Sequence, residues 1–238
     1  MTTQTDKVTL VTGSNKGIGL AIAEGLAKLG FHVVITSRTL SDAEKAATNI
    51  IASGGNASAI ELDVTNSEMV DAAAGFVREK FGRLDVLVNN AGVALDQFIP
   101  ASDVDIDLVR RTMEVNLYGA IDVTQKLLPL MKKQKHGRIV NISSELGSIG
   151  SMEMAGTLAY RTSKAALNAM TKLFALEVEV SEDILINAAC PGWVKTELGG
   201  PDAPRSTQEG ADTAIWLATL PAGGPNGALF RDRETYPW

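Results

Sequence analysis

The sequence predicts an α/β fold, a single domain built on a doubly wound parallel β-sheet with helices on both faces. Short apolar, β-branched segments alternate with helical segments along most of the chain, and this alternation is typical of parallel sheets covered on both sides. No internal repeat and no Ser- or Gly-rich linker divides the 238 residues. One large domain of this length can bury a sizeable core.

The first strand and the first helix meet at a glycine-rich turn. The β-branched run 8–11 ends at Thr12 and Gly13, and a helical pattern begins near Gly17. A helix N-terminus at the end of a strand offers free backbone N–H groups and a positive dipole end to an anion. Gly13 allows the sharp turn, Gly17 lets a pyrophosphate approach, and Gly19 lets helix and strand pack closely. Alternatively, the glycines only turn the chain.

The later elements follow the same alternation. Strands are expected at 31–36, 57–62, 84–88, 138–142 and 184–189. Helices are expected at 41–53 with Ser41 as N-cap, at 66–81, at 104–131 with Pro129 kinking or ending it, and at 157–180. The segment 197–210, with two prolines and two glycines, is either a surface connection or a substrate lid.

Composition narrows the class of partner. The net charge of −6 leaves no basic stripe for a nucleic acid, and the basic cluster at 132–138 is interpreted as a helix C-terminus. One cysteine excludes an intrachain disulfide and indicates a reducing compartment, and this cysteine with two histidines makes no metal site. The polar N-terminus and the lack of a long apolar run indicate a cytoplasmic protein without a membrane partner.

The end of the second strand bears on the choice of dinucleotide. An Asp or Glu there holds the ribose 2′-hydroxyl of NAD, whereas an Arg accommodates the 2′-phosphate of NADP. The strand ends in Thr36, Ser37 and Arg38 without a carboxylate, and Lys16 lies in the glycine turn. Two cations at this place favour NADP, because a phosphate gains charge-assisted hydrogen bonds from both. Alternatively, both side chains are merely exposed.

A candidate acid–base pair lies on the helix expected at 157–180. Tyr160 and Lys164 are four residues apart and therefore share one helix face. A phenol is a poor acid–base catalyst at neutral pH. An ammonium about 4 Å away contributes roughly 4 kcal/mol at an effective dielectric of 20, enough to lower the phenol pKa by two or three units. The spacing suits proton transfer to a carbonyl, although such pairs also occur by chance on helices.

A series of motifs strengthens this interpretation. They lie in order along the chain: Thr12 to Gly19, Asn89-Asn90-Ala91-Gly92, Val115-Asn116, Asn141-Ile142-Ser143-Ser144, Tyr160 with Lys164, and Pro191-Gly192-Trp193-Val194-Lys195-Thr196. Together they resemble the short-chain dehydrogenase/reductase (SDR) family over nearly the whole chain, and within it the carbonyl reductases. The resemblance implies a single Rossmann-type domain over 1–238, with a cofactor half at about 1–140 and a catalytic and substrate half at about 141–238.

The resemblance also implies roles for individual residues. Tyr160 would be the acid–base residue, Lys164 would lower its pKa and bind the nicotinamide ribose, and Ser144 would polarise the substrate carbonyl. Asn116 would hold a water that links Lys164 to solvent, or would instead bridge backbone at a helix bend. Ser144 is preferred to the adjacent Ser143 because the family's serine is the second of such a pair.

A larger set is expected at the cofactor. Asp63 and Val64 match the family's adenine-contacting pair, although Asp63 could also be an N-terminal cap. The full expected cofactor-binding set is Gly13, Ser14, Asn15, Lys16, Gly17, Ile18, Gly19, Arg38, Asp63, Val64, Asn90, Ala91, Gly92, Tyr160, Lys164, Pro191, Gly192, Val194 and Thr196.

These observations predict an NADPH-dependent oxidoreductase that reduces ketone, aldehyde or quinone carbonyls. One alternative is 3-oxoacyl-[acyl-carrier-protein] reductase, which calls for a basic docking patch and has a thin version of one in Arg161, Lys195 and Arg205. The other is a catalytically silent NADP-binding regulator, which the retention of Ser144, Tyr160 and Lys164 disfavours.

Two departures from the family pattern concern the substrate and the assembly. The gap between Ser144 and Tyr160 is a few residues longer than usual, and its methionines indicate an adaptable apolar wall beside the substrate, or only a longer turn. The long insertion of the monomeric animal carbonyl reductases is missing. A homodimer or homotetramer is therefore expected, with a possible contribution from Leu117, Ile121, Leu167, Met170 and Phe174.

Overall fold

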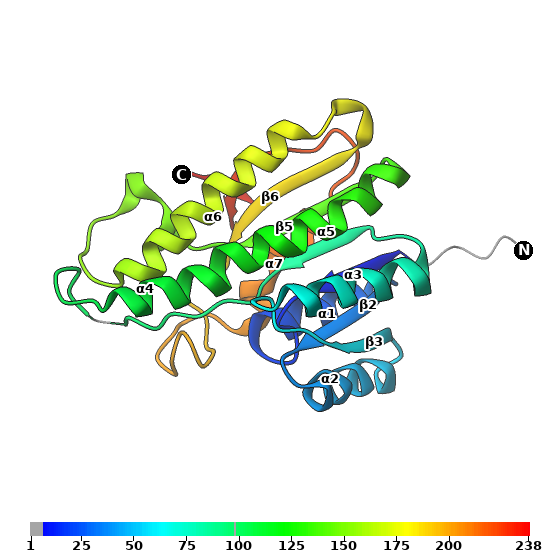
Figure 1. Cartoon of the computed structure of the whole chain (residues 1–238), viewed down its shortest axis with the longest axis horizontal. Coiled ribbons are helices and arrows are strands. Elements are labelled where there is room, and N and C mark those ends of the chain that lie inside the picture. Colours follow the sequence, from blue (N-terminus) through cyan, green and yellow to red (C-terminus); the bar gives the residue numbers. More distant parts are fainter. Residues whose placement is uncertain (1–6, 98) are drawn as a thin grey trace, which may run out of the picture.

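The computed structural model describes residues 7–97 and 99–238, and one eight-stranded sheet organises them (Figure 1). The strands are β1 (Val8–Val11), β2 (His32–Ser37), β3 (Asn56–Glu61), β4 (Val86–Asn89), β5 (Gly137–Ile142), β6 (Ile184–Cys190), β7 (Leu229–Arg231) and β8 (Glu234–Tyr236). Their spatial order is β3-β2-β1-β4-β5-β6-β7-β8, and all neighbours pair in parallel except β7 with β8. The order reverses between β1 and β4, which is where such sheets bind their ligands.

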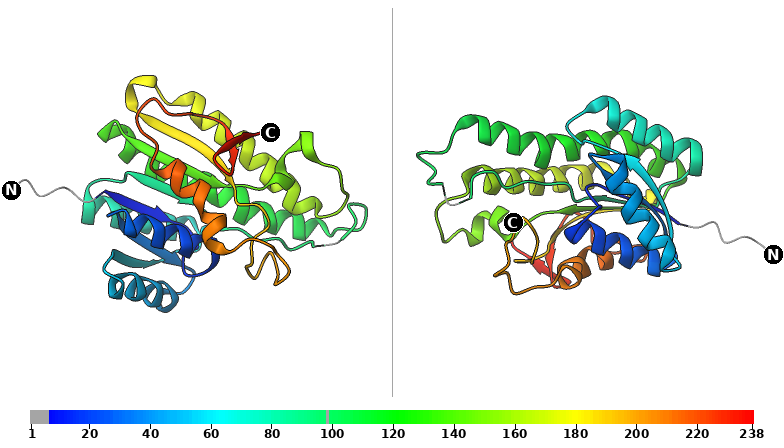
Figure 2. Two further views of the ribbon diagram at one scale, coloured as in Figure 1. Left: turned by 180° about the vertical axis from the view of Figure 1, so that it is seen from behind. Right: turned by 90° about the horizontal axis from the view of Figure 1, so that it is seen from below.

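Helices cover both faces of the sheet, as Figure 2 shows from two sides. The helices are α1 (Gly17–Lys28), α2 (Leu40–Ala52), α3 (Ser67–Phe81), α4 (Ile106–Met113), α5 (Gly119–Gln134), α6 (Leu158–Glu177) and α7 (Thr207–Ala218). Apolar side chains of α1, α2 and α7 form the cluster on one face, while those of α3, α5 and α6 pack on the other. The predicted doubly wound arrangement is therefore confirmed.

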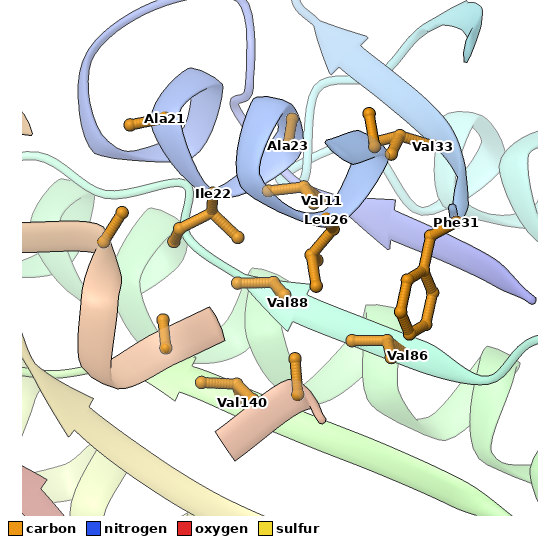
Figure 3. Close-up of a cluster of buried hydrophobic side chains, with 14 of the residues drawn as sticks. Val11, Ala21, Ile22, Ala23, Leu26, Phe31, Val33, Val86, Val88 and Val140 are labelled. Carbon is orange, nitrogen blue, oxygen red and sulfur yellow. The ribbon is translucent and has the colours of Figure 1, made fainter. Parts of the chain in front are cut away.

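The apolar face of α1 packs into a cluster of buried hydrophobic side chains on one face of the sheet (Figure 3). Ile22 and Leu26 lie one helical turn apart on α1 and meet Val11, Val88 and Phe31, all buried. Full burial of a side chain of this size stabilises the fold by roughly 1.5–3 kcal/mol. The apolar face that the sequence places on the first helix thus fixes α1, and with it the glycine turn, against the sheet.

The long helix expected at 104–131 is one helical run of three parts. A short π-helix (Glu114–Tyr118) joins α4 to α5, and the run continues to Gln134. Pro129 lies inside α5 and does not end it, contrary to one of the two expectations. Leu127, Leu128 and Met131 around it are buried, and this burial outweighs the roughly 3 kcal/mol that an interior proline costs.

Other helix boundaries follow local capping chemistry. Thr39, not the expected Ser41, is the N-cap of α2. Asn66, and not the alternative Asp63, caps α3, with its side chain accepting from two backbone N–H groups. Ser206 and Glu209 form a reciprocal capping box at the start of α7, a pattern readable in the sequence but not included in the predicted elements. The last four residues of the predicted loose segment 197–210 therefore belong to this helix.

The described residues contain neither a membrane-spanning helix nor a cluster of metal ligands. Within the described part of the chain, no helix combines the length and apolar character needed to cross a membrane. Over those same residues, no three His, Cys, Asp or Glu side chains come together in a way that could hold a metal ion.

Candidate active site

The glycine turn presents a helix end shaped for an anion. Gly13 and Gly17 have φ angles of +62° and +61°, in the left-handed region that favours glycine. The N-cap residue of α1, Lys16, makes no side-chain capping hydrogen bond. A Cβ on Gly19 would lie 2.6 Å from the carbonyl oxygen of Gly13. Free N–H groups and this close packing fit the pyrophosphate of a dinucleotide.

The loop after β4 braces the turn. The Asn90 side chain donates to the carbonyl oxygens of Thr12 and Gly13, at 2.9 and 3.0 Å, and the Thr12 hydroxyl accepts from the backbone N–H groups of Asn90 and Ala91. Ser14, expected at the cofactor, is fully buried, and its hydroxyl donates to the carbonyl of Val11. The Ser14 side chain therefore shapes the turn rather than facing a ligand.

A hollow of about 680 Å³ lies at the ends of β2 and β3. Arg38 and Asp63 both line it, as the expected adenine and 2′-phosphate region requires. Asp63 accepts from the backbone N–H and hydroxyl of Thr65, so it shapes the loop before α3 without being that helix's N-cap. Val64 is buried beside α5. Lys16 is engaged elsewhere, with its ammonium 2.5 Å from the Glu197 carboxylate.

Ser144 and Tyr160 meet at the carboxyl end of β5. Ser144 follows β5 directly, whereas Tyr160 lies in the first turn of α6, and the Ser144 hydroxyl lies close enough to the phenol to lower its pKa. The neighbouring hydroxyl of Ser143 is buried and donates to Asn168 at 2.6 Å. The Ser143 hydroxyl is thus engaged with Asn168, while the Ser144 hydroxyl lies beside the phenol. The choice of Ser144 over Ser143 stays a prediction.

Lys164 lies one turn further along α6 and is buried, with 4 % of its surface exposed. Its ammonium donates to the carbonyl oxygen of Ile142 at 2.7 Å and lies 5.7 Å from the centroid of the Tyr160 ring. Burial lowers the pKa of Lys164 to about 8, because desolvation penalises the charged form.

The phenol of Tyr160 titrates differently from the sequence-based expectation. Burial raises its pKa to about 12, and the hydrogen bond from Ser144 only partly opposes this. The shift is opposite to the expected lowering by the Lys164 ammonium, and desolvation of the phenolate is its largest cause. The phenol of the protein alone therefore stays protonated at neutral pH.

Asn116 lies in the π-helix and acts as a backbone bridge. Its carbonyl oxygen accepts from the N–H of Val93 at 2.8 Å, while its amide donates to the carbonyl of Val93 and to the hydroxyl of Ser163. The bridge joins the π-helix to the loop after β4, whereas the structural alternative was a bridge across a helix bend. The water-holding role of Asn116 stays a prediction. A Cβ on Gly92 would lie 3.3 Å from the Asn116 oxygen and 3.5 Å from the Lys164 ammonium, so these residues do gather at one place.

The segment after β6 closes over the glycine turn. The methyl group of Thr196 would lie 3.6 Å from a Cβ on Gly17, which brings two expected cofactor contacts together. Gly192 takes a φ of +73° after Pro191. The Val194 side chain, in contrast, is buried against Gly210 of α7, so only its backbone is available to a ligand.

Several site residues were not anticipated from sequence. Cys190 ends β6, its thiol accepts from the N–H of Glu145 at 3.1 Å, and burial raises the pKa of this thiol. Glu145 forms an ion pair with Arg231 of β7 beside Ser144. The adjacency of Glu145 to Ser144 was the only available signal, because contacts with a distant strand leave no local pattern.

The strand order reverses beside the glycine turn, and Ser144, Tyr160 and Lys164 lie near the carboxyl ends of the strands. These two features define a dinucleotide-binding oxidoreductase of the Rossmann type. Comparison with known proteins makes this more specific. The model of the short chain dehydrogenase family matches residues 7–206. The chain belongs to that family.

Carbonyl reductases and several solved dehydrogenases are similar to this chain. Carbonyl reductase [NADPH] 1 of Rattus norvegicus is 34 % identical, with 97 % of this chain and 98 % of the relative covered, and the Homo sapiens protein is 33 % identical over the same shares. A gluconate 5-dehydrogenase from Burkholderia cenocepacia J2315, in complex with NADP and tartrate, has a TM-score of 0.86 at 29 % identity, covering 94 % of this chain and 92 % of its own. Salutaridine reductase from Papaver somniferum has a TM-score of 0.83 at 28 % identity, covering 95 % and 99 %.

The lowered pKa of Lys164 has a consequence for stability. Between pH 8 and about 10.5 the unfolded chain holds a proton that the folded protein has released, so stability rises with pH in this window. The unfolding free energy of the wild type, relative to Lys164→Met, is expected to increase there by up to about 3 kcal/mol. Denaturant unfolding of both proteins across this range measures it. A difference in unfolding free energy between the two proteins that stayed constant over this pH range would contradict the lowered pKa of Lys164.

Proposed function

We propose that the protein reduces ketone, aldehyde or quinone carbonyls to alcohols by hydride transfer from NADPH. The placement of the Ser144 hydroxyl beside the Tyr160 phenol, next to the buried Lys164, is the observation that carries this proposal. The identity with the carbonyl reductases over nearly the whole chain supports it. Bound NADPH supplies the hydride, and the chain supplies position, polarity and a proton.

Each catalytic side chain has a task that its surroundings favour. Ser144 donates a hydrogen bond to the substrate oxygen and stabilises the negative charge that develops there. Tyr160 delivers the proton to the same oxygen. Its pKa of about 12 keeps the phenol protonated at neutral pH, so the phenol holds the proton that reduction requires. Lys164, held by the Ile142 carbonyl, places a cation beside the phenol.

We propose NADP(H) as the dinucleotide. Arg38 is exposed and lines the hollow together with Asp63. It follows the end of β2, where a dinucleotide-binding fold that prefers NAD has a carboxylate instead. Lys16 is the second expected cation, and it reaches a 2′-phosphate by leaving Glu197. The carbonyl reductase relatives carry NADPH in their names, and the gluconate 5-dehydrogenase holds NADP.

Reversal of the charge at position 38 tests this choice. Arg38→Asp is expected to raise the KM for NADPH roughly tenfold or more while the KM for NADH falls, because a carboxylate repels the 2′-phosphate and accepts from the ribose 2′-hydroxyl. Steady-state kinetics with both dinucleotides give the ratio. An unchanged NADPH/NADH ratio would argue against the role of Arg38. Arg110→Asp, in the exposed salt bridge of α4, is the matched control.

Exposed apolar side chains in the segments that follow Ser144 and β6 favour apolar substrates. Ile149 and Met154, in the loop between the two catalytic residues, are each 73 % exposed, and Trp193 and Leu198 lie exposed after β6. The acyl-carrier alternative has less support, because Arg161 is 8 % exposed and Arg205 is paired with Asp232 at 2.5 Å. Two of the three basic residues expected in a docking patch are therefore already engaged.

The consumption of NADPH with a panel of carbonyl compounds tests the proposal. Turnover of aryl ketones, quinones and aliphatic aldehydes is the expected result. Turnover confined to an acetoacetyl thioester would establish the acyl-carrier alternative. Oxidation of gluconate with NADP⁺, without reduction of any carbonyl compound in the panel, would indicate a polyol dehydrogenase. Binding of NADPH without turnover across the panel would indicate a silent binding protein and overturn the proposal.

We also propose that the protein is a homo-oligomer. Leu117, Leu167 and Met170, which were expected to contribute to an interface, are buried within the chain where α5 and α6 meet. Leu173 and Leu176 of α6 are instead 61 % and 69 % exposed. The contact is therefore expected to involve these two leucines, and the mass measured by light scattering reports the number of copies.

A further inference from the structure

We infer that Asp96 is a positioning residue that sets Tyr160 in place by capping the helix that carries it. Its side chain is fully buried. One carboxylate oxygen accepts from the N–H of Ala159 at 2.6 Å and the other from the N–H of Tyr160 at 3.3 Å. Asp96 thus binds the backbone of the proposed proton donor itself, from a loop 64 residues earlier in the chain.

The start of α6 depends on a distant cap because its own N-cap residue does not supply one. Thr157 has a φ of +53°, a strained conformation for a β-branched residue, and makes no capping hydrogen bond. Its hydroxyl donates to the carbonyl of Gly156. The first hydrogen bond within the helix runs from Arg161 to Thr157, so the N–H groups of Ala159 and Tyr160 have no partner in the helix itself.

The N-terminus of α6 also provides the groups that compensate the buried carboxylate of Asp96. No ion pair to Asp96 occurs among the residues that the structure describes, so its compensation comes from the two N–H groups and the positive end of the α6 dipole. A buried carboxylate held in this way is sensitive to the position of the helix, since any displacement of α6 would leave the charge unsatisfied.

The loop that carries Asp96 also borders the cofactor site. Four residues earlier, Gly92 lies beside the Lys164 ammonium, and Val93 exchanges two hydrogen bonds with Asn116. One residue later, Gln97 donates to the carbonyl of Leu198 in the segment that closes over the glycine turn. Asp96 therefore ties Tyr160 to the same loop that contacts the Lys164 and glycine-turn regions.

The inference rests on the proposed function in one respect, namely that Tyr160 delivers the proton. Asp96→Ala removes both hydrogen bonds and is expected to lower kcat about 10- to 100-fold, because small displacements of a reacting group have effects of this size. The dissociation constant for NADPH is expected to stay within about threefold of the wild-type value, since binding needs no aligned phenol. Asp96→Asn keeps one acceptor oxygen and is expected to retain an intermediate kcat.

Asp105 supplies the matched control. Its carboxylate caps α4 by accepting from the N–H of Asp107 at 2.9 Å, but it is exposed and outside the site. Asp105→Ala is expected to lower Tm slightly and to leave kcat within about twofold of the wild-type value. The contrast separates loss of a helix cap in general from loss of the cap that positions Tyr160.

Amide hydrogen exchange, measured by NMR, tests the capping of α6 by Asp96 without relying on any catalytic activity. The N–H groups of Ala159 and Tyr160 are expected to exchange roughly tenfold faster or more in Asp96→Ala, whether or not a carbonyl substrate has been found. Faster exchange together with a loss of kcat at constant NADPH affinity supports the inference. Unchanged kcat in both Asp96 variants, or parallel loss of NADPH binding, kcat and Tm in both, would overturn it. Inactivity of the wild type would count against the proposed function alone.

Discussion

Tyr160→Phe is expected to lower kcat by ~10²–10⁴-fold, the range that a general acid contributes. The substitution removes the proposed proton donor and its interaction with the Ser144 hydroxyl, but it retains the ring that lies beside the Lys164 ammonium. The dissociation constant for NADPH is expected to change by no more than about threefold, because Tyr160 is only one of many groups expected at the cofactor and its ring is retained. Carbonyl reduction in the steady state and a fluorescence titration with NADPH measure the two effects.

Tyr118→Phe is the matched control for this variant. It makes the same chemical change on a side chain that is 51 % exposed in the π-helix, and full kcat is expected. A Tyr160→Phe protein that kept more than about a tenth of the wild-type kcat would show that another group, or water, delivers the proton.

Gly147→Ala is expected to disturb the site through packing alone. A Cβ on Gly147 would lie 2.7 Å from the carbonyl carbon of Lys164 and 2.9 Å from the backbone nitrogen of Ala165. Backbone atoms of a buried helix cannot move away freely, so α6 must shift relative to the turn that carries Ser144. The free energy of unfolding is expected to fall by about 1–3 kcal/mol, and kcat is expected to fall ~10- to 100-fold because Ser144 and Tyr160 separate.

Gly75→Ala controls for the substitution itself. Gly75 lies inside α3, and a Cβ there would meet only the Arg78 guanidinium at 3.6 Å, so stability is expected to rise by up to about 1 kcal/mol. Denaturant unfolding and kcat are measured on both variants. If Gly147→Ala lost stability but kept full kcat, the packing of α6 on this turn would not be what aligns Tyr160 with Ser144.

The sequence was informative wherever the chemistry is local. The glycine turn at 13–19 could be predicted because strand, glycines and helix are contiguous in the chain. Tyr160 and Lys164 could be paired because four residues make about one helical turn. The start of the helix expected at 66–81 is equally local, and the structure places α3 at Ser67–Phe81.

What the sequence did not reveal depends on contacts between distant segments. Asp96 reaches α6 from a loop after β4, and Arg231 reaches Glu145 from a three-residue strand too short to leave a pattern. The pKa of Tyr160 was predicted to fall because spacing along the helix shows the nearby Lys164. The burial that raises this pKa instead is set by segments from elsewhere in the chain.

The transfer of deuterium from NADPH labelled at the reactive C4 position tests the central claim most directly. An aryl ketone is incubated with the protein and the labelled cofactor, and the alcohol is examined by mass spectrometry. The account predicts one deuterium on the carbinol carbon for each NADPH consumed, with Tyr160→Phe forming the same product far more slowly. Consumption of NADPH without label in the product, or formation of no alcohol, would contradict hydride transfer to the carbonyl.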